Sequence, residues 1–289
     1  MKLIIIIAIS AILINQAQAQ SPAAEEYFKR GVARYQQGDF EGAIKDYDRA
    51  IAAHTGVISK PDAIKILEPG TASIYYNRGV ARFDLMDWDG AIADLNEAIT
   101  LNPRFVMAYI KRGNTRLNKA EWDEAVADFT QALRLVPDSE MALVNRGLAQ
   151  QNKGELELAL RDYDQALKLN PQLAVAYNNR GGIKHDLKDF KGALADYDQA
   201  LKIDPTLAMV WSNRGVTHKA MGNVQQAIAD YSKAIELRPG FGLAYFNRSM
   251  AWKALKNYEK ARQDFEQSQR WQDPIEPMRL EPPVAKPEQ

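Results

Sequence analysis

The chain contains no cysteine among its 289 residues. Disulfide bonds, thiol catalysis and cysteine-ligated zinc or iron–sulfur centres are therefore excluded. Histidine is scarce, with only three in the chain, and this argues against a histidine-based metal centre. Charge of one sign is not in excess either, because 37 Lys and Arg balance 37 Asp and Glu. Since nucleic-acid-binding proteins usually carry a basic excess, we expect no nucleic-acid partner.

The short motifs that accompany common enzyme chemistry are also missing. The sequence has no glycine-rich phosphate-binding loop and no G-x-S-x-G nucleophile motif. His185 and His218 are the best candidates for metal ligands, but a metal site needs three or four convergent ligands. We therefore expect no catalytic residue, no cofactor and no bound metal, and predict that the protein is not an enzyme.

No apolar run is long enough for a comfortable membrane anchor. Leu3–Ile14 is an uncharged run of twelve residues, whereas a spanning helix needs about 20. The run follows a positive N-terminus and precedes Ala17 and Ala19, the small-x-small pattern of a signal-peptidase site. We expect residues 1–19 to be a signal peptide cleaved between Ala19 and Gln20. This predicts an exported protein, periplasmic or secreted, with no stable membrane anchor after cleavage.

An internal repeat dominates the rest of the chain. The tripeptide Asn-Arg-Gly, or a close variant, recurs every 34 residues, with its last residue running from Gly79 to Ser249. Prolines from Pro103 to Pro239 keep the same step. An earlier copy ends at Gly31, so 14 extra residues separate the first two copies. A fixed period of this length indicates a solenoid.

Within each copy, the apolar residues have helical spacing. In residues 174–207, they follow an i, i+3, i+4, i+7 pattern over 190–203, after a break near Asp186–Asp189. Pro205 then ends this second helix. Each copy is therefore predicted to be two antiparallel helices joined by a tight turn.

The copies resemble the tetratricopeptide repeat family over about residues 24–271. The shared motif has a small residue on the first helix, an aromatic residue between two small residues on the second helix, and a final proline. In the repeat over residues 174–207, these residues are Gly181, Ala193, Tyr197, Ala200 and Pro205. The resemblance implies an all-α fold, a right-handed α-solenoid of about seven helix-turn-helix repeats. The small residues let paired helices approach closely, and the aromatic fills the space toward the neighbouring pair.

The repeat register divides the chain into segments. We expect a solenoid domain over residues 20–271, with repeats near 24–57, 72–105, 106–139, 140–173, 174–207, 208–241 and 242–271. Residues 58–71 form an insertion after the first repeat. Residues 272–289 contain five prolines and no apolar periodicity, which predicts a disordered or polyproline tail.

An arginine on each first helix precedes an aspartate on the second by 16 residues, as Arg180 precedes Asp196. Opposite charges in matched register predict an ion pair between the two helices of each repeat. The alternative is a stripe of arginines that binds an anionic ligand.

A column of asparagines is the candidate binding feature. One position of the first helix, just before the arginine, is occupied by Asn77, Asn145, Asn179, Asn213 and Asn247. The resemblance implies that first helices line the concave face of the solenoid, where these amides would form a column. A side-chain amide offers a donor and an acceptor, so it can hold a peptide backbone without reading its sequence. Local hydrogen bonding within the solenoid is the alternative.

Apolar side chains are expected to surround this column in the groove. The positions that we assign to the lining are Tyr76, Ile110, Val144, Leu148, Met209 and Phe246, together with the polar Asn178. Such a groove suits an extended apolar segment, or another copy of the chain.

These features predict an exported scaffold or adaptor that binds extended segments of a protein or peptide partner. Two alternatives remain open from the sequence: a self-associating structural or assembly subunit, and a non-catalytic arm of an enzyme complex.

Overall fold

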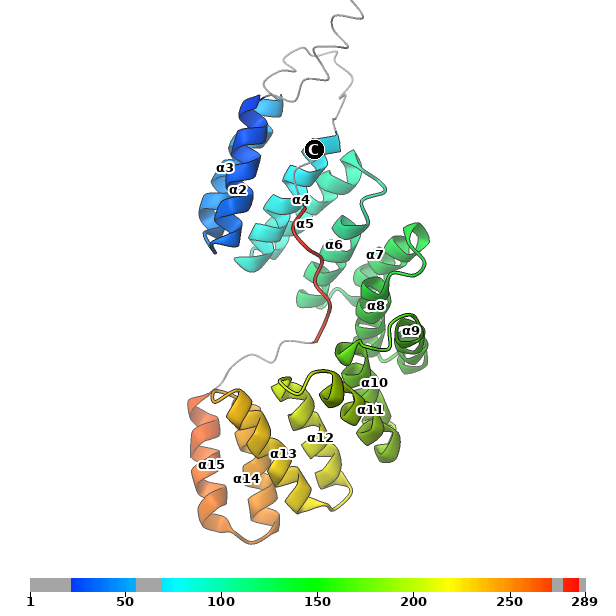
Figure 1. Cartoon of the computed structure of the whole chain (residues 1–289), viewed down its shortest axis with the longest axis vertical. Coiled ribbons are helices and arrows are strands. Elements are labelled where there is room, and N and C mark those ends of the chain that lie inside the picture. The colour runs from blue at the N-terminus through cyan, green and yellow to red at the C-terminus, as the bar shows by residue number, and fades with distance from the viewer. Residues whose placement is uncertain (1–21, 56–68, 272–277, 286–289) are drawn as a thin grey trace, which may run out of the picture. The chain divides into compact units, whose positions relative to one another are not determined.

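The computed structural model describes residues 22–55, 69–271 and 278–285. In this part of the chain, it contains fourteen α-helices and no strand. Consecutive helices pair as antiparallel hairpins, and neighbouring hairpins pack in chain order within residues 22–135 and, separately, within residues 140–270 (Figure 1). The predicted all-α solenoid is confirmed.

We call the first helix of each pair an A helix and the second a B helix. The A helices are α2 (Pro22–Gln36), α4 (Pro69–Asp84), α6 (Val106–Asn118), α8 (Glu140–Lys153), α10 (Ala174–Asp186), α12 (Ala208–Ala220) and α14 (Gly242–Ala254). The B helices are α3 (Phe40–Thr55), α5 (Trp88–Leu101), α7 (Trp122–Leu135), α9 (Leu156–Leu169), α11 (Phe190–Ile203), α13 (Val224–Leu237) and α15 (Tyr258–Arg270).

The chain forms two compact units, which are described separately. The N-terminal unit contains α2–α7 together with residues 281–285 of the C-terminal segment. The C-terminal unit contains α8–α15 together with residues 278–280.

The repeated glycine of each A helix allows close packing against its B helix. A Cβ atom built on Gly113 would lie 2.6 Å from the ring of Phe129, and one on Gly147 would lie 2.7 Å from Tyr163. The aromatic ring therefore lies directly over the glycine of its own pair. It also reaches the next repeat, since Tyr197 shares an apolar cluster with Val210 of α12. This packing agrees with the role that the sequence predicts for both residue types.

The turn between the A and B helices contains a residue in the left-handed region at one register position. Three repeats place glycine there: Gly38, Gly154 and Gly222, with φ between 80° and 84°. Four others use residues with side chains: Met86, Ala120, Lys188 and Lys256, with φ between 58° and 63°. Only glycine adopts this conformation without a steric penalty, so the latter turns carry local strain.

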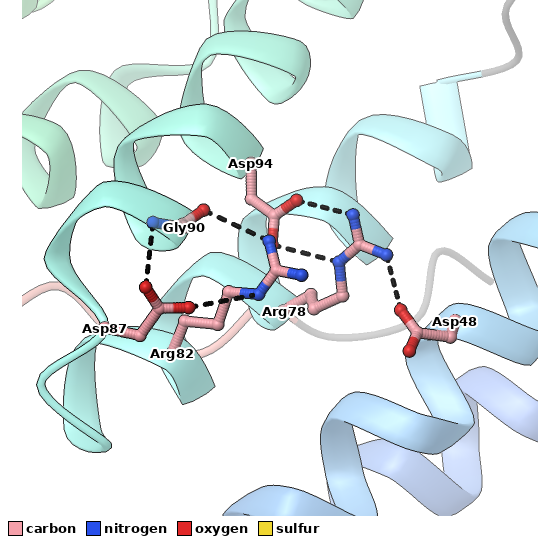
Figure 2. Close-up of polar contacts among 6 residues, drawn as sticks. All are labelled: Asp48, Arg78, Arg82, Asp87, Gly90 and Asp94. Carbon is pink, nitrogen blue, oxygen red and sulfur yellow. Dashed lines mark hydrogen bonds and ion pairs between the residues drawn. The ribbon is translucent and has the colours of Figure 1, made fainter.

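The predicted ion pairs between A and B helices are confirmed. Arg78 of α4 donates from Nε and Nη2 to the two carboxylate oxygens of Asp94 at 2.9 and 2.6 Å (Figure 2). Equivalent pairs recur in each repeat: Arg30–Asp46, Arg112–Asp128, Arg146–Asp162, Arg180–Asp196, Arg214–Asp230 and Arg248–Asp264. In each repeat, the arginine is therefore paired with an aspartate of its own repeat. The alternative, in which these arginines form a stripe that binds an anionic ligand, would need the same guanidinium groups.

The same arginines also bind the preceding B helix, a contact that the sequence analysis missed. Arg78 donates from Nη1 to Asp48 of α3 at 2.5 Å (Figure 2). Corresponding bonds join Arg112 to Asn96, Arg180 to Asp164, Arg214 to Asp198 and Arg248 to Ser232. Each of these arginines therefore connects two consecutive repeats.

Some predictions lie outside the described residues. They are the signal peptide with its Ala19–Gln20 cleavage site and residues 58–68 of the insertion. Helix α4 begins at Pro69, inside the range assigned to the insertion. No helix in the described ranges is long and apolar enough to cross a membrane.

Candidate functional site

An extended segment, residues 278–285, lies against the A helices. The segment is red in Figure 1. Residues 281–285 contact α4 and α6 of the N-terminal unit, and residues 278–280 contact α8 and α10 of the C-terminal unit. The sequence left two alternatives for this region, a disordered or a polyproline tail. Residues 278–285 have no helix or strand in the structure and contact the A helices through backbone and side-chain groups.

Asn145 of α8 holds both backbone groups of one residue of this segment. Its Nδ2 donates to the carbonyl oxygen of Leu280 at 2.6 Å, and its Oδ1 accepts from the Leu280 N–H at 2.8 Å. Asn145 is fully buried. The amide therefore satisfies one donor and one acceptor of an extended backbone at the same time.

Asn77 of α4 makes the same two-bond contact in the N-terminal unit. Its Nδ2 donates to the carbonyl oxygen of Ala285, and its Oδ1 accepts from the Ala285 N–H, both at 2.8 Å. The neighbouring Tyr76 hydroxyl donates to the carbonyl oxygen of Pro283 at 2.6 Å. Burial raises the pKa of Tyr76, which keeps this hydroxyl protonated as a donor.

Asn179 of α10 binds the segment with support from neighbouring amides. Its Nδ2 donates to the carbonyl oxygen of Met278 at 2.9 Å, while its Oδ1 accepts from Nδ2 of Asn178 at 3.0 Å. The Oδ1 of Asn178 in turn accepts from Asn213 of α12 at 3.0 Å. This chain of bonds orients the Asn179 amide with its donor toward the segment.

Lys111 of α6 binds a side chain of the segment. Its Nζ lies 2.9 Å from Oε2 of Glu281 and 3.5 Å from the centroid of the Phe83 ring. The side chain of Lys111 is only 4% exposed, and that of Glu281 is 38% exposed. This pair combines an ion pair with a cation–π contact.

Apolar side chains of the segment also pack on the A helices. Val284 and Ala285 contact the cluster of the N-terminal unit that contains Tyr76. Met278 contacts the cluster of the C-terminal unit that includes Trp211. Pro282 is buried. The segment therefore presents both its backbone and its apolar side chains to the A helices.

Four of the residues predicted for the groove contact the segment: Asn77, Asn145, Asn179 and Tyr76. Asn213 contributes through Asn178, and Asn247 is half-buried on α14. Among the predicted apolar positions, Ile110 and Val144 are fully buried, Leu148 is buried and Met209 is half-buried against its cluster. Phe246 is 41% exposed and lies beside the ring of Phe265.

The sequence analysis missed the role of Lys111 and the docked segment, whereas it placed Asn178 in the groove. Lys111 could have been recognised as a binding residue from the sequence, because it occupies the register position at which most repeats have asparagine. Residues 278–285 have no periodic pattern that would predict docking.

The described residues contain no group of three or more His, Cys, Asp or Glu side chains that could hold a metal ion. His185 contacts Thr217 of α12, with 2.9 Å between Nδ1 and Oγ1. The chemistry that the site offers is hydrogen bonding and ion pairing to an extended chain.

Sequence models of the tetratricopeptide repeat match most of the chain. One matches residues 141–173, 174–207 and 208–241; a second matches 11–58 and 28–104; a third matches 243–273. The chain belongs to the tetratricopeptide repeat family. Proteins with this fold generally mediate protein–protein interactions by binding protein or peptide partners, and the fold is typically non-catalytic.

Solved structures agree with this tetratricopeptide repeat fold. A tetratricopeptide repeat protein from Parabacteroides merdae is 18% identical, with a TM-score of 0.70 over 87% of this chain and 94% of that one. MamA from Desulfovibrio magneticus RS-1 is 19% identical, with a TM-score of 0.55 over 65% and 99% of the two chains. The pilF protein of Pseudomonas aeruginosa is 23% identical, with a TM-score of 0.54 over 58% and 77%. A search of the curated proteins found no match.

Proposed function

We propose that this tetratricopeptide repeat protein binds extended segments of partner proteins on its A helices and holds them by their backbone. One observation carries the proposal. Asn77 and Asn145, at the same register position two repeats apart, each pair with both the N–H and the carbonyl of one residue in an extended segment.

This contact suits an adaptor, because it depends on groups that nearly every residue provides. The paired amide bonds fix the position of one residue of the bound chain, since its N–H and its carbonyl must both meet the amide. A net value of about 0.5–1.5 kcal/mol for each hydrogen bond gives useful affinity only when several contacts act together.

In the structure, the occupant is the chain's own C-terminal segment. Its contacts are those that a partner segment would make, so residues 278–285 serve as the reference ligand. A partner that uses these amides has to replace this segment.

Hydrogen exchange in the full chain tests the asparagine contacts directly. The N–H groups of Leu280 and Ala285 are the donors to Asn145 and Asn77, so each reports on one contact. We expect Asn145→Ala to accelerate exchange at Leu280, and Asn77→Ala at Ala285, by roughly twofold to tenfold. Residue-resolved NMR exchange rates provide the measurement.

Asn247→Ala is the matched control, because Asn247 occupies the same register position on α14. It should leave exchange at Leu280 and Ala285 unchanged, and circular dichroism should report full helicity in all three variants. If exchange at both amides equals the random-coil rate in the wild type, the segment is not held and the proposal is wrong.

We further propose that the protein acts outside the cytoplasm, as a periplasmic or secreted adaptor. The support is the sequence pattern of residues 1–19, which predicts a mature chain starting at Gln20.

Self-association is a second candidate, favoured by exposed apolar side chains on α14. Leu243, Phe246 and Met250 are 37%, 41% and 39% exposed. Contiguous exposed apolar surface often marks an interaction site. Sedimentation of the full chain over a range of concentrations distinguishes the candidates, since the adaptor alone stays monomeric.

A further inference from the structure

Two positions in the asparagine column are lysine: Lys29 of α2, which pairs with Glu25 of its own helix, and Lys111 of α6. The column runs through Asn77, Lys111, Asn145 and Asn179 at steps of 34 residues, so α6 presents an ammonium group where its neighbours present an amide. The three asparagines bind backbone atoms, whereas Lys111 binds the carboxylate of Glu281.

We propose that Lys111 is a specificity-determining residue that selects a glutamate in the segment bound by the N-terminal unit. The inference rests on the proposed function, and it adds a sequence preference to a contact that otherwise reads only the backbone. The partner would be an extended segment that carries this glutamate, with the chain's own residues 281–285 as the example.

The ammonium group also contacts an aromatic ring of the N-terminal unit itself. Its Nζ lies 3.5 Å from the centroid of the Phe83 ring, and with the segment docked the Lys111 side chain is almost completely buried. A buried, positioned ammonium loses much of its hydration, so an incoming carboxylate gains more here than on an open surface. A neutral side chain in the same place cannot supply that charge.

The position of the glutamate in the segment is defined by the second contact. Glu281 lies four residues before Ala285, the residue held by Asn77. Pro282 and Pro283 lie between them, and neither has an N–H that needs an acceptor. Prolines also favour an extended backbone before binding, which lowers the entropy lost on docking. The ligand class is therefore an extended segment with a glutamate followed by prolines and an apolar residue.

Paired peptides measure this selectivity on the full chain. One probe has the sequence of residues 278–285, and the other differs only by glutamine in place of Glu281. Both are titrated by fluorescence anisotropy into full-length Glu281→Lys protein, whose own segment lacks the carboxylate. The ratio of the two Kd values is independent of competition from the attached segment, because that competition affects both peptides equally.

We expect the glutamate peptide to bind about tenfold more tightly, a value between those of exposed and buried ion pairs. Introducing Lys111→Met into the same protein should bring the ratio to about one. Methionine matches lysine in length and suits a buried site, so the fold should survive. If Lys111→Met nevertheless fails to fold, hydrogen exchange at Ala285 in Glu281→Gln full-length protein provides the second measurement, with faster exchange expected.

The outcomes separate this inference from the proposed function. A ratio of one with Lys111 intact, while Asn77→Ala still accelerates exchange at Ala285, overturns the selectivity and leaves backbone binding in place. A tenfold ratio that persists in Lys111→Met shows that another group reads the carboxylate, and the role of Lys111 is wrong. A ratio of one together with random-coil exchange at both Leu280 and Ala285 in the wild type overturns the two proposals together.

Discussion

At the scale of single residues, one arginine in each repeat has two structural tasks. Arg180 donates two hydrogen bonds to Asp196 of its own repeat and one to Asp164 of the preceding B helix. The planar guanidinium can make these contacts together because its donors point in different directions. A lysine could replace its charge but not this geometry.

Replacing Arg180 with alanine should therefore weaken the contacts within and between repeats. We expect Arg180→Ala to lower the free energy of unfolding by about 1–3 kcal/mol. The reason is that the side chain of Asp196 is only 5% exposed and loses the two hydrogen bonds that Arg180 donates. Urea denaturation followed by circular dichroism measures the change. Arg161 is exposed on α9, and Arg161→Ala should change stability by less than about 0.5 kcal/mol.

The opposite result would give the arginine column a binding role. Arg180→Ala with unchanged stability, but faster exchange at the docked Leu280 N–H, would show that the column acts on the bound segment instead of on the repeats.

Residues differ in how far the sequence predicts their role. The Arg–Asp pairs follow from opposite charges that recur in fixed register, so the 34-residue period was sufficient to predict them. The second bond of each arginine, as in Arg78 to Asp48, joins different repeats and depends on how the repeats stack. The asparagine column was recognisable because five amides share one position, but the partner of Lys111 lies 170 residues away in the chain.

At the scale of elements, the helical hairpins depend on turns that adopt a left-handed conformation. Gly222 has a φ of 82°, and no atom lies within 4 Å of a Cβ built on it. Glycine is therefore favoured at this turn by the left-handed backbone conformation, and not because a side chain would clash with its neighbours. Gly182 of α10 has ordinary helical geometry, and a Cβ there would meet its nearest atoms at 3.9 Å.

The same substitution should therefore have opposite effects at these two glycines. Gly222→Ala should destabilise the protein by about 1 kcal/mol, because an L-residue pays a steric cost in the left-handed region. Gly182→Ala should stabilise it by about 0.5–1 kcal/mol, because alanine loses less entropy in a helix. Thermal unfolding of both variants gives the comparison, and equal signs would contradict the explanation.

The elements themselves were largely predictable, since helix periodicity is a local property. The break near Asp186–Asp189 and the stop before Pro205 correspond to the end of α10 at Asp186 and of α11 at Ile203. The docked segment was not predictable, because its conformation is determined by long-range contacts such as Asn77 with Ala285. Five prolines and the absence of periodicity describe an extended chain but not the surface that it binds.

At the scale of the whole molecule, the reference ligand is part of the protein. Residues 272–277 join it covalently to α15, so the segment is present at high effective concentration near the A helices. A free segment with the same contacts competes against this advantage. The affinity that a partner experiences is therefore reduced by the fraction of molecules whose A helices are already occupied.

Two substitutions in the segment test this competition without altering the A helices. Leu280→Pro and Ala285→Pro each remove the N–H that donates to Asn145 or Asn77, while proline keeps the backbone extended. The double variant should bind a free peptide of residues 278–285 about tenfold more tightly than the wild type does, because two contacts of about 0.5–1.5 kcal/mol no longer hold the attached segment. Fluorescence anisotropy gives both Kd values, and a peptide with the same two prolines is the control, expected to bind more weakly to either protein. Equal affinity of wild type and double variant for the unmodified peptide would mean that the attached segment does not restrict access. In that case, the segment would be a model for the ligand but not its competitor.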